Sequence, residues 1–391
     1  MKKTITICLF IITNFSFSQT RTITGVVKDV TTLLPVESVS ISLIDSNIGT
    51  ISNEEGKFRI TLPENSKAIN FSHLYYKLET HVLKGNETEI EIFLEPKSFV
   101  LDEVVINQKP GKTLLEEAVD ASKSKLEKSL LLTTYYREFI NVDSKYTNFS
   151  DGIIDYYVKR KNGASDLYVK QSRTFDLKDE NASEREKAIL SVNLNDVRKA
   201  VSNAYSFKMV AQILKSDKYN FGVETKSETG GSSIEIITIE PKENLEDEFI
   251  YEGTVTYDFK TKLILDINLR FSPEHKKYSV IHNILIAKVK FNDIVRRASF
   301  KIDGDKYVMI YSQVKSNVYL KFGKKINNTF ESLCDITTLN YKEGEFDLDK
   351  SKKYKESSLF TNGNKYTEEF WKKYDVILLN DAEQKIINTF K

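Results

Sequence analysis

Residues 251–258 and 263–271 read Tyr-Glu-Gly-Thr-Val-Thr-Tyr-Asp and Leu-Ile-Leu-Asp-Ile-Asn-Leu-Arg-Phe, with Lys260-Thr261-Lys262 between them. Apolar and polar residues alternate through most of both runs, which is typical of strands that bury one face. A short polar segment between two such runs indicates a turn. The whole stretch therefore predicts two long antiparallel strands in succession.

Similar runs occur on both sides of this pair and are unusually rich in aromatic residues. The composition agrees, because 20 Tyr and 23 Phe stand against 15 Gly and 6 Pro, and aromatic rings pack well on a pleated surface. We expect an antiparallel meander. Its other clearest strands are residues 135–139, 152–157 and 234–239.

Length and charge limit the classes of protein to consider. The 391 residues predict two domains, each with a core of its own. Lys and Arg number 57 against 56 Asp and Glu, so the net charge of +1 provides no basic excess for a nucleic acid. Charged residues at 29% and hydrophobic residues at 40% indicate a globular chain, and no stretch after the N-terminus is apolar enough for a transmembrane segment.

The N-terminus has the order of a secretory signal peptide. Lys2 and Lys3 precede an apolar run at residues 5–17, and the small residues Ser16 and Ser18 stand just before Gln19. We predict a signal peptide at residues 1–18 and a mature protein in the periplasm or at the outer membrane.

The two cysteines contribute little chemistry. Cys8 lies inside the predicted signal peptide and follows Ile5-Thr6-Ile7, which lacks a lipobox, so we do not expect a lipoprotein. Cys334 would be the one cysteine of the mature chain and cannot form an internal disulfide. Its apolar surroundings predict a small buried residue in a strand.

Residues 19–96 predict a small β-domain. Residues 39–43 and 90–94 alternate apolar and polar side chains, and about seven such strands fit between frequent turns. Asn53-Glu54-Glu55-Gly56 predicts a turn, and residues 57–60 then resume the alternation, so we expect a hairpin here. Short alternating strands without helical periodicity favour a β-sandwich.

Three stretches of this domain resemble the carboxypeptidase regulatory-like domain that follows the signal peptide in many Gram-negative outer-membrane proteins: residues 25–29, 34–41 and 49–58. The resemblance implies a seven-stranded, transthyretin-like β-sandwich without catalytic residues, although Tyr75 stands where the family usually has Gly. Residues 101–106 resemble the segment leading into the plug of a TonB-dependent receptor. No plug or barrel follows, so receptor function is not implied.

Residues 97–112, with Pro110 and Gly111, predict a linker to a β-rich domain at residues 113–391. Thr113 is a candidate N-cap for an amphipathic helix of about five turns on the sheet. A second helical segment is expected at residues 182–215 as an insertion or cover. The apolar positions of the first helix are Leu115, Val119, Leu126 and Leu130.

A helix across a long meander resembles the half-barrel of periplasmic lipoprotein carriers. Residues 113–391 also resemble uncharacterised regions that follow the regulatory-like domain in other exported envelope proteins, through Tyr135-Tyr136-Arg137-Glu138 and the aromatic segment at residues 370–374. These relatives imply no activity. The predicted fold is mainly β: a small sandwich, then a larger antiparallel sheet or half-barrel with a few helices.

The histidines do not have the spacing of a zinc site. No HExxH motif is present, and none of the four has Glu three residues later. His275 and His282 stand in a strand-like region, where a spacing of seven places them on opposite faces of a sheet. We predict no metal site. The four histidines are His73, His81, His275 and His282.

Serine-dependent catalysis has equally little support. Ser122 and Ser312 each stand three residues before a lysine, but a chain this rich in serine and lysine contains such pairs by chance. Asp303-Gly304-Asp305 indicates a turn rather than a calcium loop, and Gly230-Gly231 indicates a hairpin tip. We predict no catalytic, cofactor-binding or metal-binding residues and no cofactor, and we leave the ligand-binding residues undefined.

Three functions remain open. The favoured hypothesis is a non-catalytic envelope protein that binds a partner protein, an apolar ligand such as a lipid, or a glycan. The others are a hydrolase acting on an envelope polymer and a structural scaffold of an outer-membrane complex. A groove with apolar walls would favour binding, a closed and packed sheet would favour a scaffold, and a pair of carboxylates in a cleft would favour hydrolysis.

The export prediction can be tested directly. The charged residues Lys2 and Lys3 followed by an apolar run predict cleavage before Gln19. Mass spectrometry of protein from fractionated cells should show a chain that begins at Gln19 in the envelope fraction. An intact Met1 in the cytoplasm would contradict the prediction.

Overall fold

The computed structural model describes residues 20–100, 109–126, 128–159, 164–176, 194–228, 233–362 and 378–381, together with Glu383, Lys385 and Asn388. Several predicted features lie outside the described residues. They are the signal peptide, the plug-leading segment at residues 101–106, the hairpin tip at Gly230-Gly231 and the aromatic segment at residues 370–374.

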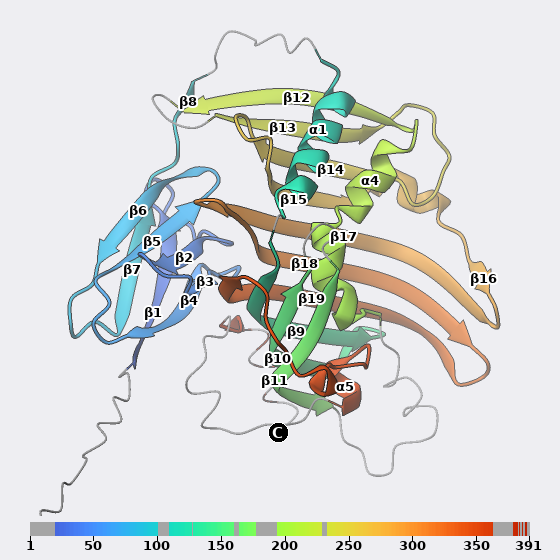
Figure 1. Cartoon of the computed structure of the whole chain (residues 1–391). Coiled ribbons are helices and arrows are strands. Elements are labelled where there is room, and N and C mark those ends of the chain that lie inside the picture. The colour runs from blue at the N-terminus through green and yellow to red at the C-terminus, as the bar shows by residue number, and fades with distance from the viewer. Residues whose placement is uncertain are drawn as a thin grey trace, which may run out of the picture.

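The N-terminal strands form two facing sheets, as predicted (Figure 1). One sheet has the order β4-β1-β7, with β1 and β7 parallel, and the other has the order β3-β2-β5-β6. Alternate residues of β4, namely Phe58, Ile60 and Leu62, are fully buried between them. The strands are β1 (Thr20–Asp29), β2 (Ser40–Leu43), β3 (Gly49–Ile51), β4 (Lys57–Pro63), β5 (Ala68–His73), β6 (Tyr76–Val82) and β7 (Glu89–Leu94).

The turn at Asn53–Gly56 is present, but the predicted hairpin is wrong. Gly56 has a φ of +69°, and a Cβ there would lie 2.4 Å from the carbonyl oxygen of Val27. The turn carries the chain from β3 in one sheet to β4 in the other, where β4 pairs with β1. In the sequence, a turn between two stretches of alternating apolar and polar residues looks the same whether the second strand pairs with the first or crosses to the opposite sheet.

The remaining strands form one large antiparallel sheet. Its order is β11-β10-β9-β19-β18-β17-β15-β14-β13-β12-β8, and β16 pairs with β17 beside this path. The strands are β8 (Phe99–Val100), β9 (Leu130–Val142), β10 (Lys145–Val158), β11 (Ser165–Asp176), β12 (Tyr219–Glu228), β13 (Ser233–Pro241), β14 (Tyr251–Asp258), β15 (Ile264–Phe271), β16 (His282–Ile284), β17 (Ala287–Asp303), β18 (Lys306–Phe322) and β19 (Ile326–Glu343).

The predicted meander is interrupted at one place. Strands β12 to β15 and β17 to β19 follow chain order, but β9, β10 and β11 form a separate meander that joins the sheet through the pairing of β9 with β19. The predicted turns at Lys260-Thr261-Lys262 and Asp303-Gly304-Asp305 are confirmed, and Gly304 has a φ of +59°. The first and last long strands of the domain are therefore neighbours.

The segment predicted as a linker has regular structure at both of its ends. Phe99 and Val100 form β8, which pairs with Glu228 and Ser227 at the end of β12. Helix α1 begins at Gly111. The larger sheet thus includes chain that directly follows the sandwich.

Helix α1 (Gly111–Ser124) is shorter than predicted and is not capped by Thr113, which lies inside it. Pro110 occupies the N-cap position without a side-chain hydrogen bond. Gly111 is pressed against β12, since a Cβ there would lie 2.7 Å from the carbonyl oxygen of Phe221. The helix ends early because the chain turns into β9, which begins at Leu130. Leu126 and Leu130 have the apolar spacing of the helix but lie beyond its end.

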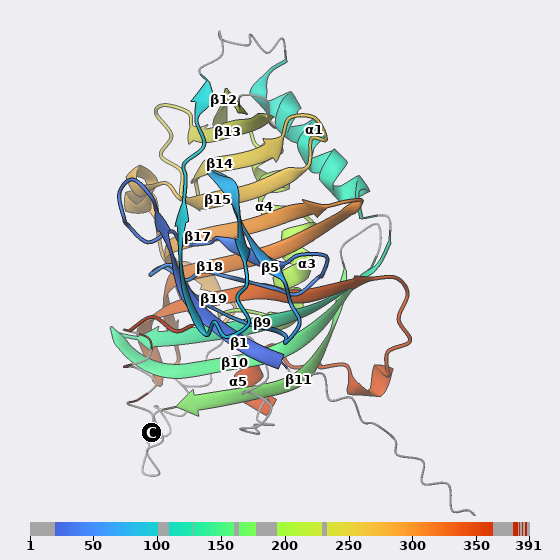
Figure 2. The same cartoon turned by 90° about the vertical axis from the view of Figure 1, so that its left-hand side faces the viewer.

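The helices and the sandwich lie on opposite faces of the large sheet, and Figure 2 shows the sandwich in front of it. On β9, Tyr136 joins the core under the helices, whereas Tyr135 contacts Ile51 of the sandwich. The described part of the predicted 182–215 segment is helical. The remaining helices are η1 (Val197–Lys199), α3 (Ala200–Tyr205), α4 (Lys208–Leu214), η2 (Pro273–Tyr278), η3 (Lys350–Lys352) and α5 (Leu359–Asn362).

Within the described ranges, no helix has the length and apolar character needed to cross a membrane.

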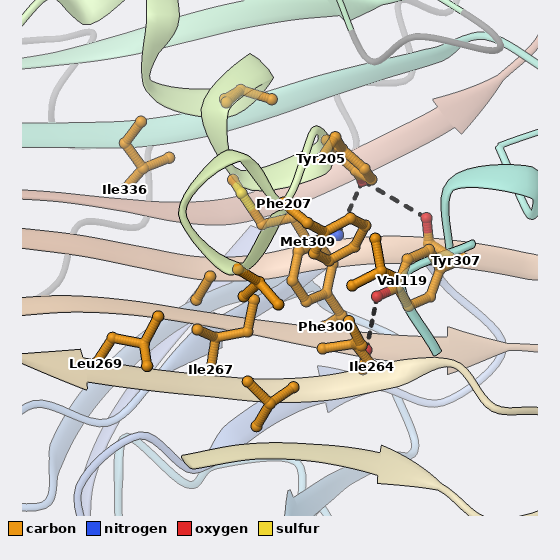
Figure 3. Close-up of a cluster of buried hydrophobic side chains, with 14 of the residues drawn as sticks. Val119, Tyr205, Phe207, Ile264, Ile267, Leu269, Phe300, Tyr307, Met309 and Ile336 are labelled. Carbon is orange, nitrogen blue, oxygen red and sulfur yellow. Dashed lines mark hydrogen bonds between the residues drawn. The ribbon is translucent and has the colours of Figure 1, made fainter. Parts of the chain in front are cut away.

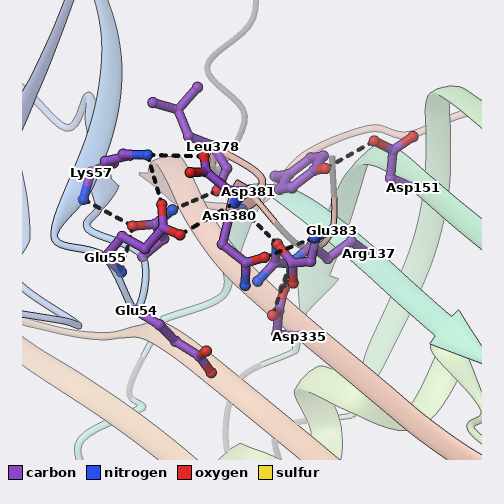
Figure 4. Close-up of polar contacts among 12 residues, drawn as sticks. Glu54, Glu55, Lys57, Arg137, Asp151, Asp335, Leu378, Asn380, Asp381 and Glu383 are labelled. Atoms are coloured by element: carbon purple, nitrogen blue, oxygen red, sulfur yellow. Dashed lines mark hydrogen bonds and ion pairs between the residues drawn. The ribbon is translucent and has the colours of Figure 1, made fainter. Parts of the chain in front are cut away.

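A buried ionic network lies on the sandwich side of the sheet (Figure 4). Arg137 Nε of β9 donates to both carboxylate oxygens of Asp335 on β19, at 2.8 and 2.9 Å, and Arg137 Nη1 donates to Glu383 at 2.9 Å. The nearby C-terminal residues also contact the sandwich, because Lys57 Nζ lies 3.1 Å from Asp381. The network therefore links β9, β19, the C-terminal segment and the sandwich.

Removing the arginine should strongly destabilise the fold. Arg137 is 6% exposed and Asp335 is fully buried, so Arg137→Ala leaves a buried carboxylate without its cation. We expect the free energy of unfolding to fall by about 3–5 kcal/mol. Urea denaturation measures it.

Arg198→Ala is the matched control. Arg198 pairs with Asp196 at 2.8 Å, but its side chain is 42% exposed, and removing an exposed pair costs about 0–1 kcal/mol. Equal effects of the two substitutions would contradict the role assigned to Arg137.

Candidate functional site

A cavity of about 300 Å³ lies between helices α3 and α4 and the large sheet. Strands β15, β17, β18 and β19 form its floor. Ala200, Ala204, Phe207 and Val210 line it from the helical side. Its volume is at the lower end of the range for small-molecule sites, roughly 300–1,000 Å³.

Strand register builds the floor from two rows of side chains. Alternate residues of a strand face the same side, so each strand supplies one residue to each row. The first row is Ile267, Ala298, Ser312 and Ile336, and the second is Leu269, Arg296, Val314 and Cys334. Six of these eight side chains are apolar or, in the case of Cys334, weakly polar, so the floor suits an apolar ligand.

The cavity exists because small side chains oppose one another. Ala200 and Ala204 of α3 lie opposite a floor that contains Ala298 and Ser312. Phe207, at the junction of α3 and α4, has a φ of +49° and rests against Phe300 with the ring centroids 5.5 Å apart. Figure 3 shows Phe207 facing the apolar side chains of β15.

Arg296 and Arg297 of β17 both border the cavity, and strand register places Arg296 in the second row of the floor. In the part of the chain that the structure describes, no carboxylate forms an ion pair with Arg296. Its guanidinium donates a hydrogen bond to the hydroxyl of Tyr251, and its buried Nε has no hydrogen-bond partner. Asn203, Lys208 and Gln212 add polar groups on the helical side. An apolar cavity with the cationic Arg296 in its floor suits a molecule that has an apolar body and an anionic group.

Glu138 extends the second row beyond the cavity. It pairs in register with Cys334, is 1% exposed, and accepts hydrogen bonds from Asn195 at 3.0 Å and Tyr136 at 3.1 Å. Burial raises the pKa of Glu138 to about 7, although both hydrogen bonds oppose the shift. A carboxyl group that titrates near neutral pH thus adjoins the cavity floor.

Cys334 is a buried residue of β19, as predicted. Burial raises the pKa of its thiol well above the usual value, and the nearby Glu138 carboxyl adds to the shift. The thiolate needed for nucleophilic chemistry is therefore disfavoured. Cys334 serves here as part of the cavity wall.

The two serines with a lysine three residues later differ in position. Ser122 is buried in α1, and its Oγ accepts a hydrogen bond from the backbone N–H of Ile264 at 2.9 Å. Ser312 lines the cavity, whereas Lys315 reaches Glu54 of the sandwich at 3.3 Å. Residues three apart on a strand face opposite sides, so the structure does not bring Ser312 and Lys315 together.

The histidines are dispersed, and no group of three or more metal-ligating side chains occurs within the described residues. The prediction that His275 and His282 occupy opposite faces of one sheet is wrong, because His275 lies in η2. Its Nδ1 lies 3.0 Å from Ser272 Oγ, and His282 Nε2 lies 2.7 Å from Glu248. Pro273 begins η2, which ends at Tyr278, and β16 then begins at His282, so the two histidines lie in different elements.

His73 and His81 belong to the sandwich. Burial and the charge of Lys97 lower the pKa of His73 to about 4. His81 Nε2 lies 3.3 Å from Glu87.

A second space of about 650 Å³ lies between the sandwich and the sheet. Carboxylates, hydroxyls and basic groups form much of its wall, including Asp266, Ser299 and Lys301. Such a surface suits water or a polar solute better than an apolar ligand. The cavity below α3 and α4 is therefore the better candidate site.

Sequence comparison identifies the N-terminal domain. Residues 23–106 match the CarboxypepD_reg-like domain, which confirms the resemblance. No curated protein sequence matches the chain.

Solved structures show only distant similarity. A DUF1329 family protein from Desulfovibrio piger is 13% identical, with a TM-score of 0.23 over 62% of this chain and 97% of its own. A LolA superfamily protein from Nitrosomonas europaea is 10% identical, with a TM-score of 0.20 over 63% and 98%. Lipovitellin is 7% identical, with a TM-score of 0.23 over 57% of this chain, which spans only 26% of lipovitellin. Similarities of this size carry no functional argument.

The burial of Glu138 predicts a pH dependence of stability. Its pKa rises from 4.5 to about 7 on folding, so the folded state binds more protons between these values. The contribution of Glu138 to the free energy of unfolding should therefore fall as pH rises from about 4.5 to 7, by an amount on the order of 3 kcal/mol.

Glu138→Gln keeps a hydrogen-bonding side chain but removes the titration, so it should flatten this part of the pH profile measured by urea denaturation. Glu331→Gln, at an exposed position of the neighbouring strand β19, is the control and should retain the slope of the wild type. Parallel profiles for the wild type and Glu138→Gln would contradict the prediction.

Proposed function

We propose that this protein is a non-catalytic binding protein of the cell envelope, and that its larger domain binds an apolar ligand carrying an anionic group. The observation that supports this most directly is the cavity under α3 and α4, which combines apolar walls with Arg296. The ligand class is a long-chain acid or a lipid with an anionic head, because that chemistry matches both parts of the wall.

The floor would hold the apolar body of the ligand. Ile267, Leu269, Val314 and Ile336 offer methyl and methylene groups across three strands, and burying apolar surface is worth about 25 cal/mol per Å². Arg296 would donate to the anionic group, and a hydrogen bond to a charged group contributes about 1.5–3 kcal/mol. The apolar body of the ligand provides most of the binding affinity, and Arg296 orients the ligand through its anionic group.

Two further features support the envelope setting and the absence of catalysis. Lys2, Lys3 and the apolar run after them support export. The cavity wall contains Ser312 and Cys334, but Lys315 lies on the other face of the sheet and burial disfavours the thiolate of Cys334. These arrangements support a binding role over hydrolysis.

Titration with a fluorescent long-chain fatty acid tests the proposal. The wild type should bind with saturation, and Ala298→Leu should lower the affinity at least tenfold because the larger side chain fills the floor. Val295→Leu is the matched control, since residue 295 faces the other side of β17 and lines a different pocket. Saturable binding that Ala298→Leu leaves unchanged would place the ligand elsewhere.

The role of Arg296 needs a charge-specific comparison. Arg296→Gln should weaken binding of the fatty acid about tenfold or more and leave binding of the matching fatty alcohol nearly unchanged. Equal losses for the acid and the alcohol would show that Arg296 acts through packing. No binding of either compound to the wild type would favour the scaffold hypothesis.

A further inference from the structure

The turn between β16 and β17 exposes apolar side chains at the end of the sheet. Leu285 is 98% exposed and Ile286 is 79% exposed. Val280, Ile281 and Ile284 beside them are each about half exposed. Figure 1 shows this end of the sheet on the side away from the sandwich. A group of adjacent exposed apolar side chains of this kind marks an interaction site in soluble proteins.

Local folding preferences do not explain these residues. Leu285 and Ile286 form a two-residue turn, and Leu285 has a φ of +53°. Gly or Asn is favoured at the position of Leu285 because these residues adopt a positive φ at little cost. A leucine in this conformation is both strained and exposed, so its apolar side chain has a use outside the fold.

The turn is held in a defined position. Glu248 lies 2.7 Å from His282 Nε2 and accepts a hydrogen bond from the backbone N–H of Val280 at 3.1 Å. The ring of Phe249 lies 5.3 Å from that of His282 and 5.7 Å from that of Phe291. The apolar side chains are therefore presented on an anchored hairpin.

Positive charge surrounds the apolar residues. Residues 275–292 and 318–330, which meet in the pairing of β17 with β18, contain seven lysines and no Asp or Glu. Lys288 stands directly opposite Lys321, an arrangement of like charges that destabilises a strand pair. Within these two segments, the lysines are Lys276, Lys277, Lys288, Lys290, Lys321, Lys324 and Lys325.

Some carboxylates from other segments approach this end of the sheet. Asp293 pairs with Lys276 at 2.8 Å, and Glu248 is engaged with His282. Lys288 and Lys321 are exposed, and neither belongs to the ion pairs found among the described residues. The charge around the apolar turn is thus predominantly positive.

We propose that the turn at Leu285 and Ile286 inserts into the surface of an anionic lipid membrane, with Lys288, Lys321 and Lys324 contacting the headgroups. A few apolar side chains with basic flanks suffice for interfacial binding, and each lysine near an anionic surface contributes favourably. A protein partner usually requires about 800 Å² on each side, more than a projecting two-residue turn offers. This membrane contact is separate from the ligand cavity and does not depend on it.

Vesicle co-sedimentation of the full chain tests the proposal. The wild type should bind vesicles of phosphatidylcholine with about 30% phosphatidylglycerol more tightly than pure phosphatidylcholine, and added salt should weaken the binding. Leu285→Asn/Ile286→Ser should lower binding at least tenfold while stability stays equal or rises, because Asn adopts the positive φ of position 285 at less cost than Leu. Lys288→Gln/Lys321→Gln should lose most of the preference for the anionic vesicles.

Leu33→Asn/Leu34→Ser is the matched control. Leu33 and Leu34 are 61% and 63% exposed, and Leu33 also has a positive φ of 59°, but both lie in the sandwich. This variant should bind vesicles like the wild type. The proposal is overturned if the wild type binds neither vesicle, if both leucine variants bind alike, or if sedimentation velocity shows that the turn mediates self-association instead.

Discussion

The pairing of β9 with β19 is the contact on which the rest of the larger domain depends. It joins the first long strand of the domain to the last, and it places Arg137 opposite Asp335 on one face and Glu138 opposite Cys334 on the other. A slip of one residue would turn the buried Arg137 toward the apolar core under the helices. The Arg137–Asp335 ion pair therefore penalises the wrong register, and the correct register sets both the surface that meets the sandwich and the far end of the cavity floor.

Local structure was largely predictable from the sequence, because alternation and turn residues act over a few positions. The strands on either side of Lys260-Thr261-Lys262 and the turn at Gly304 are examples. Long-range pairing was not predictable from the same signals. The turn at Asn53–Gly56 has every local feature of a hairpin, yet β4 pairs with β1 because that pairing closes a second sheet over the core. Leu130 continued the spacing of the first helix but begins β9, which pairs with the distant strand β19.

The candidate site depends even more on distant parts of the chain. Ala298 and Ser312 are ordinary small strand residues until register aligns them with Ile267 and Ile336 beneath the alanines of α3. Arg296 and Arg297 look alike in sequence and both border the cavity, but alternation places them on opposite faces of β17, where Arg297 reaches Glu37 of the sandwich at 3.5 Å. A signal was available in Tyr135-Tyr136-Arg137-Glu138, where two charged residues interrupt an aromatic strand. Both are now found buried, on opposite faces of the sheet.

The ligand cavity and the β16–β17 turn share one physical feature. In both places, other residues would stabilise the fold more than the residues present. Opposed small residues leave a space where larger ones would pack, and Leu285 is strained and exposed where Asn would serve the turn. Arg137 differs, because its ion pairs satisfy the charges that burial isolates. Buried charge is thus used where the structure must be specified, whereas unfilled space and exposed apolar surface occur where a molecule outside the chain can complete the contacts. This distinction assigns the sandwich side near Arg137 to architecture, and the cavity and the β16–β17 turn to binding.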